Sequence, residues 1–202
     1  MRKVFAILLA SLLLVCLVYP TYAESIENPE SFSSISIKDP ETGETWVWSV
    51  PEDALTISSE QTRSGTPFIT SAIEFDATDY LNQTFAANPS GSETLNDDII
   101  ITAGLRYSYN ESTNKVRLYN AFGSTTNSGM YYASDRVFTW AHPKANLGDT
   151  RYPGTSSWNY AVTSTEAKYS RLNKPYATLE CRVYVTDMSA YRELTVTYYL
   201  EP

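Results

Sequence analysis

The sequence predicts an all-β protein, an antiparallel two-sheet β-sandwich of about nine strands with an Ig-like or jelly-roll-like architecture. Three observations lead to this prediction. Almost every ordered-looking stretch alternates apolar and polar residues with a period of two, which is typical of half-buried strands. No segment has a convincing amphipathic helical pattern, and the best helical candidate, Glu52 to Ser58, is short. Residues 35–202 also have the length of one sandwich domain.

The expected strands begin with an N-terminal hairpin. Ile35 and Ile37 form the first strand, and Trp46, Trp48 and Val50 lie on one face of the second. The segment between them, Asp39 to Gly43, has proline early and glycine late, which suits a type I turn closed by a residue at positive φ. A third alternating stretch runs from Ile69 to Ala77.

Two more hairpins are expected, one central and one C-terminal. A long strand from Ile99 to Tyr109 is followed by polar turn residues and by a strand from Val116 to Phe122. The clearest alternation, Tyr176 to Val185, precedes the last strand, Leu194 to Leu200. The remaining strands are expected at Tyr131 to Trp140 and Trp158 to Val162. The alternation places Cys181 in the core as a small apolar residue. Long loops are expected at residues 82–96 and 141–156.

Residues 1–23 are typical of a secretory signal peptide. Met1-Arg2-Lys3 is cationic, Val4 to Val18 carries no charge, and Thr21-Tyr22-Ala23 offers small residues near a cleavage site. Cys16 leaves lipidation open, although bulky Val15 fits a lipoprotein cleavage box poorly. We expect a cleaved signal, a disordered leader at residues 24–34, and a secreted, extracellular domain that does not contact the membrane after cleavage.

Charge and cysteine content narrow the expected partners. The chain carries 15 basic and 23 acidic residues, and loss of Arg2 and Lys3 leaves 13 against 23, a net charge near −10. An acidic protein repels phosphate backbones and anionic lipid, so we expect no nucleic-acid partner. Only Cys181 remains after cleavage, so no intramolecular disulfide is expected in a disulfide-permissive compartment. This thiol poverty favours a bacterial or archaeal cell-surface environment.

No catalytic or metal-binding motif stands out, and we expect no cofactor. His142 is the only histidine and no G-x-S-x-G or H-E-x-x-H motif is present, so we expect His142 to be a loop residue. Asn96-Asp97-Asp98 and Asp149 lack the spacing of a calcium loop. Paired carboxylates, Glu74 with Asp76 or Glu180 with Glu193, leave a small secreted hydrolase as an alternative.

Aromatic residues give the only positive indication of binding. Tyr119 beside Arg117, Tyr184 beside Arg182, and Tyr199 all fall on expected polar strand faces. If their strands are neighbours, these five residues would form one exposed patch. Tyrosine also suits any solvated strand face without a function. The prediction is a non-enzymatic domain that binds an extracellular glycan or protein, with a self-associating structural or surface subunit as the alternative.

Overall fold

The computed structural model describes residues 32–60, 67–85, 99–127 and 129–202. The expected signal peptide and most of the expected leader lie outside the described residues, although Ser34, the last leader residue, already belongs to the first strand. Among the described residues, no helix is long and apolar enough to cross a membrane.

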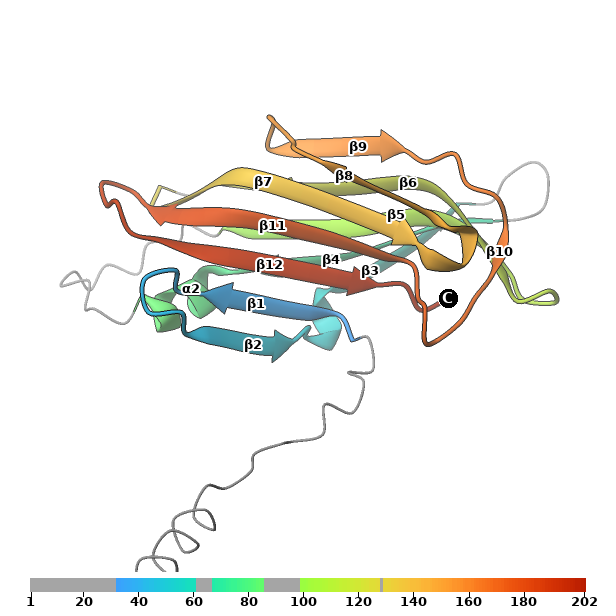
Figure 1. Ribbon diagram of the computed structural model, residues 1–202, viewed down its shortest axis with the longest axis horizontal. Coiled ribbons are helices and arrows are strands. Elements are labelled where there is room, and N and C mark those ends of the chain that lie inside the picture. The colour runs from blue at the N-terminus through green and yellow to red at the C-terminus, as the bar shows by residue number, and fades with distance from the viewer. Residues whose placement is uncertain (1–31, 61–66, 86–98, 128) are drawn as a thin grey trace, which may run out of the picture. The chain divides into compact units, whose positions relative to one another are not determined.

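The described chain forms two six-stranded antiparallel sheets packed face to face, so the predicted β-sandwich is confirmed (Figure 1). Sheet A has the order β2-β1-β12-β11-β7-β8. Its strands are β2 (Thr45–Ser49), β1 (Ser34–Lys38), β12 (Tyr191–Tyr199), β11 (Tyr176–Val185), β7 (Tyr131–His142) and β8 (Leu147–Arg151).

Sheet B has the order β10-β6-β5-β4-β3, and β9 pairs with the other end of β6. Its strands are β10 (Ala167–Lys168), β6 (Lys115–Thr125), β5 (Ile100–Asn110), β4 (Phe68–Asp76), β3 (Leu55–Glu60) and β9 (Ser157–Ala161). The edge strands β2 and β3 are joined through the short 3-10 helix η1 (Glu52–Ala54) and border one flank of the sandwich.

The core lies between the sheets and is built from the alternate residues that the sequence pattern assigns to the apolar faces. Phe138, Leu179 and Val196 are fully buried in sheet A, and Leu105 and Leu118 are fully buried in sheet B. Burial of these side chains removes apolar surface from water, which is the main favourable term in folding. The hydrophobic effect therefore selects one register for each strand, because a slip of one residue would turn these side chains outward.

The predicted hairpins are present, and so is the predicted burial of the cysteine. β1 pairs with β2, β5 with β6 and β11 with β12, and Gly43 closes the first turn with φ of +76°. Cys181 is buried, and desolvation raises the pKa of its thiol to about 12. The thiol therefore stays protonated and is a poor nucleophile.

The sequence pattern missed five elements. These are β3, β8, β10, the helix α2 (Thr78–Thr84) and the 3-10 helix η2 (Pro143–Ala145). Residues 82–85 and 141–156 were expected to be loops, yet α2 enters the first segment, while β8 and η2 (Pro143–Ala145) lie in the second. The short helical candidate from Glu52 to Ser58 contains only the 3-10 helix η1, because β3 begins at Leu55 and pairs with β4. Residues 86–96 of the first expected loop lie outside the described residues.

Candidate functional site: the outer face of sheet A

The outer face of sheet A carries a row of tyrosines on three neighbouring strands. Tyr184 on β11 lies directly opposite Tyr132 on β7 and Tyr191 on β12. The ring centroids of Tyr184 and Tyr132 are 5.2 Å apart at an interplanar angle of 10°, and those of Tyr184 and Tyr191 are 5.2 Å apart at 35°. Because cross-strand aromatic pairs hold each other in place, the row is preorganised. We call Tyr132, Tyr184 and Tyr191 the tyrosine row.

Arg182 continues the row toward the middle of the sheet. Its guanidinium carbon lies 5.0 Å from the ring centroid of Tyr191, and one of its nitrogens lies 3.0 Å from a carboxylate oxygen of Asp135. Tyr191 first, and Asp135 after it, raise the pKa of Arg182. The side chain is therefore a permanent cation fixed between a ring and a carboxylate.

A β-bulge in β7 forms the floor beside Arg182. The pairing of β7 with β11 shifts its register between Glu180 and Arg182, and Asp135 adopts a left-handed backbone with φ of +48°. Asp135 directs its carboxylate to Arg182, whereas Arg136 donates to the Thr125 hydroxyl at 2.8 Å and to the Ala133 carbonyl at 2.7 Å. The extra residue thus presents a carboxylate where regular pairing would place none.

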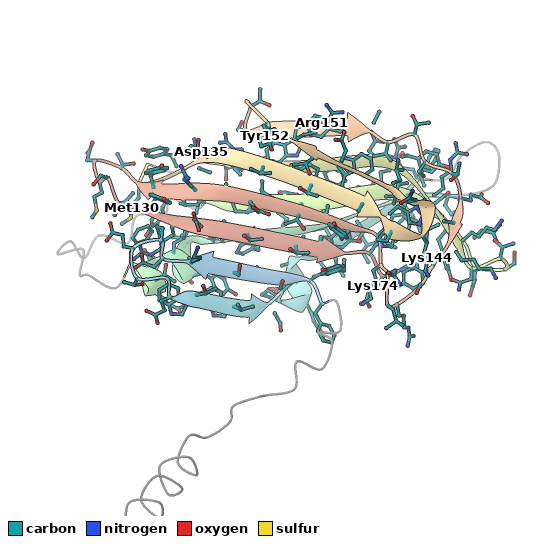
Figure 2. All side chains as sticks on the ribbon, viewed as in Figure 1. Met130, Asp135, Lys144, Arg151, Tyr152 and Lys174 are labelled. Carbon is teal, nitrogen blue, oxygen red and sulfur yellow. The ribbon has the colours of Figure 1, made fainter. Side chains whose placement is uncertain are left out.

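An open groove of about 730 Å³ lies over this bulge. Its floor includes Glu180, Arg182, Glu193 and Thr195 from β11 and β12, and its wall is the segment Tyr152-Pro153-Gly154 that leaves β8. Figure 2 labels Asp135 and Tyr152 on this side of the sandwich, near the edge formed by β7 and β8. Tyr152 is 77% exposed. The groove therefore combines an exposed ring with charged and hydroxyl side chains.

Glu180 is the groove's available carboxylate. Asp135 is paired with Arg182, and Glu193 lies 3.2 Å from the ammonium of Lys38. Among the described residues, no hydrogen bond or ion pair engages the exposed Glu180 side chain. A carboxylate has about four acceptor positions, so Glu180 can accept hydrogen bonds from a ligand. Glu180 and Glu193 share this outer face, on the adjacent strands that the sequence indicated.

A second aromatic pair lies at the other end of the same face. Tyr176 on β11 is opposite Tyr199 on β12, with ring centroids 5.8 Å apart. Burial, and then the neighbouring Tyr176, raise the pKa of Tyr199, so its phenol stays neutral. Threonines occupy the face between the two aromatic groups, where the hydroxyls of Thr178 and Thr197 are 3.3 Å apart.

The predicted single patch is wrong, because its members lie on different sheets. Tyr184, Arg182 and Tyr199 belong to sheet A, but Arg117 and Tyr119 belong to β6 of sheet B. Tyr184 and Tyr199 face the same side, yet they lie at opposite ends of the β11–β12 pair. Alternation assigns a residue to a face but does not state which strands are neighbours, so the patch required a strand order that the fold does not have.

Sequence reasoning also missed Tyr132, Tyr191, Asp135 and Tyr152. One signal for the bulge was present. In residues 131–140 the buried positions change from odd numbers, Tyr131 and Ala133, to even numbers, Phe138 and Trp140. Such a change of phase within one strand requires an inserted residue. The last strand was expected to begin at Leu194, whereas β12 begins at Tyr191.

The other candidate residues do not assemble a site. His142 was expected in a loop, but it ends β7 and is fully buried, and burial lowers its pKa. Glu74 and Asp76 are exposed on β4, and Asp149 pairs with Arg151 at 2.6 Å. Asn96-Asp97-Asp98 lie outside the described residues. In the part of the chain that the structure describes, no cluster of three or more metal-ligating side chains occurs.

Comparisons with known proteins do not identify a relative. No protein-family model, no curated protein and no solved structure matches the chain.

Proposed function

We propose that the protein is exported and binds an extracellular glycan through the outer face of sheet A. The observation that supports this proposal most directly is the tyrosine row beside a groove with an available carboxylate. Aromatic faces cover the apolar faces of sugar rings, and carboxylate and hydroxyl groups exchange hydrogen bonds with sugar hydroxyls. The inference that the protein is exported rests on the signal-peptide pattern of residues 1–23 and is part of the proposal.

A glycan suits this face better than a protein partner does. Stable protein interfaces have a fully desolvated anchor residue at the centre, and their charged residues lie at the rim. Here the charged residues Glu180 and Arg182 are central, and the rings stack on one another rather than project as separate anchors. A ligand rich in hydroxyl groups can satisfy such charges without leaving any of them unpaired. Since Glu180 and the acidic chain repel anions, neutral and amino sugars are favoured over acidic ones.

The first test is a glycan array followed by titration calorimetry with the strongest ligand. Tyr184→Ala removes the central ring of the tyrosine row and should weaken binding about tenfold, which corresponds to about 1.4 kcal/mol. Glu180→Gln keeps the side-chain shape and removes the charge, and should weaken binding by a similar factor.

Matched controls come from sheet B. Tyr119→Ala removes a ring from the opposite sheet, and Glu74→Gln neutralises an exposed strand carboxylate there. Both should leave the affinity unchanged. The proposal is rejected if no oligosaccharide binds, or if the control variants weaken binding as much as Tyr184→Ala. Preferential binding of acidic oligosaccharides would contradict the role given to Glu180.

A further inference from the structure

The ladder formed by β11 and β12 carries an aromatic pair at each end of its outer face. Tyr184 lies opposite Tyr191 at one end, and Tyr176 lies opposite Tyr199 at the other. The register between the two strands continues without a shift from one pair to the other, so every second residue stays on one face. All four tyrosines are half-buried. The two pairs therefore lie along one line in the middle of sheet A (Figure 1).

The two aromatic pairs are too far apart for a short ligand. The eight residue steps from Tyr176 to Tyr184 span about 27 Å at about 3.4 Å per residue of antiparallel strand. A disaccharide is much shorter than this distance. A single glycan can contact both pairs only if it is an extended chain of several sugar units.

Three pairs of polar residues fill the distance between the aromatic pairs. In order from the tyrosine row, they are Arg182 with Glu193, Glu180 with Thr195, and Thr178 with Thr197. The first two pairs line the groove. The threonine pair, whose hydroxyls are 3.3 Å apart, continues the polar surface from the groove to Tyr176 and Tyr199. Hydroxyl groups donate and accept hydrogen bonds, so a chain with hydroxyl groups along its whole length finds partners at each pair.

We propose that this face binds one extended polysaccharide chain, which runs parallel to β11 and β12 and contacts both aromatic pairs. The inference rests on the proposed glycan-binding function and adds the class of glycan. A β-1,4-linked chain of glucose or N-acetylglucosamine units is an extended ribbon with C–H groups on its faces and hydroxyl groups along its edges. The faces contact the tyrosine rings, and the edges reach the polar residues between them.

The charges of this face favour a neutral chain. Arg182 is held by Asp135 at 3.0 Å, and Glu193 is held by Lys38 at 3.2 Å. Glu180 then gives the middle of the face a negative charge, which opposes the binding of an acidic polysaccharide.

A chain that crosses the strands suits the face less well. Thr178 lies opposite Thr139 of β7, and Thr139 lies opposite Thr150 of β8. The Thr139 and Thr150 hydroxyls are 3.0 Å apart and bond to each other. A chain laid along this row would contact threonine side chains, whereas a chain parallel to the strands meets an aromatic pair at each end.

Titration calorimetry with cellobiose and cellohexaose, and with N-acetylated chitin fragments of the same lengths, tests the length of the site. For the series that binds more tightly, we expect one hexasaccharide per protein. It should bind at least about tenfold more tightly than the disaccharide, because one chain joins two contact regions. Maltohexaose, an α-linked chain that coils, should bind more weakly than either β-1,4-linked hexasaccharide.

Tyr176→Ala is the decisive variant. It removes a ring from the end of the site outside the groove, so it should weaken hexasaccharide binding about fivefold and leave disaccharide binding in the groove unchanged. Tyr176→Phe keeps the ring and should bind as the wild type does. Tyr184→Ala should weaken the binding of both ligands. Thr139→Val, beside the proposed path, is the matched control and should change neither affinity. Circular dichroism verifies that each variant folds.

The inference is overturned by a hexasaccharide that binds no more tightly than the disaccharide, or by wild-type hexasaccharide affinity in Tyr176→Ala. Reduced affinity in Thr139→Val, with wild-type affinity in Tyr176→Ala, would place the chain across the strands. Maltohexaose that binds as tightly as the β-1,4-linked chains would contradict the extended shape. In each of these cases, a loss of affinity in Tyr184→Ala still supports glycan binding by this face. If no oligosaccharide binds at all, the proposed function itself is rejected.

Discussion

The outer faces of the two sheets carry similar residues and use them differently. On sheet B, the rings of Phe68 and Tyr119 meet edge to face at 4.5 Å, and the Arg106 guanidinium lies 4.7 Å from the Phe68 ring. Phe122 lies against Gly104, where there is no side chain. These rings pack on the backbone and the neighbouring side chains of sheet B itself. On sheet A the tyrosine row borders a groove in which Glu180 remains available.

The difference shows that residue type alone does not distinguish a ring that packs on its own sheet from a ring that lies beside an open groove. The pairs Arg117–Tyr119 and Arg182–Tyr184 look alike in the sequence. The Arg117 guanidinium lies near the Tyr119 ring, whereas the Arg182 guanidinium lies near the Tyr191 ring of the next strand. What separates them is the neighbouring strand. The Tyr119 hydroxyl lies 3.3 Å from the Ser108 hydroxyl on β5, whereas the neighbour of Arg182 is the bulge at Asp135, which opens the groove.

The largest effect should come from disturbing the covered face of sheet B. A Cβ at Gly104 would lie 2.5 Å from the Ala72 Cβ, 2.6 Å from the Phe122 ring and 2.8 Å from the Ser71 carbonyl oxygen. Gly104→Val should therefore lower the free energy of unfolding by about 3 kcal/mol, because the backbone atom cannot move aside. Denaturant unfolding measures the loss.

Gly154→Val is the control for that substitution. Gly154 lies on the groove wall, and a Cβ there meets nothing within 4 Å. Its stability should change by less than about 0.5 kcal/mol. If both glycine variants destabilise the protein equally, the distinction between a covered and an open face fails.

The pH dependence of stability tests the core side of sheet A. Burial holds the pKa of His142 below its ordinary value, and neither imidazole nitrogen has a hydrogen-bond partner among the described residues. As the pH falls below about 6.5, the unfolded chain binds a proton that the folded chain excludes, so stability is lost toward acid. His142→Phe should reduce this loss between about pH 7 and about pH 5, as measured by thermal unfolding. If His142→Phe loses as much stability toward acid as the wild type does, the idea that the folded chain holds a buried, neutral imidazole is contradicted.

A small effect on stability, with a clear effect on the proposed ligand binding, is expected at the bulge. Asp135 has a left-handed backbone that glycine adopts without strain. Asp135→Gly gives up an exposed ion pair and relieves the backbone, so the free energy of unfolding should change by less than about 1 kcal/mol. Ligand affinity should fall, since Arg182 loses the carboxylate that orients it.

Asn114→Gly is the counterpart on sheet B. Asn114 also has positive φ, 51°, and lies in the turn between β5 and β6. Its replacement should alter stability by a similarly small amount and leave ligand binding as it was. Equal ligand affinity for the wild type and Asp135→Gly would show that the bulge is not part of the proposed binding site.

The strands could be predicted because burial of every second residue produces an alternation of apolar and polar residues in the sequence. β5 and β11 are clear examples. β3 escaped prediction for a physical reason: its core-side residues Leu55 and Ile57 are exposed, so burial does not enforce a pattern there. The site was harder to predict because it depends on strand order. Tyr132, Tyr184 and Tyr191 are far apart in sequence and meet only through the pairing of β7, β11 and β12.

The pairing of β1 with β12 determines how the domain would respond to mechanical force. Ser34 is opposite Thr197 and Lys38 is opposite Glu193, so the start of β1 and the end of β12 lie at the same end of the pair. Tension applied through these two ends would open the ladder one residue pair at a time, like a zipper, instead of shearing all its hydrogen bonds together. The rate of forced unfolding would therefore depend strongly on the direction of pulling. A pull through Lys38 and Thr197, at opposite ends of the same two strands, would meet much greater resistance.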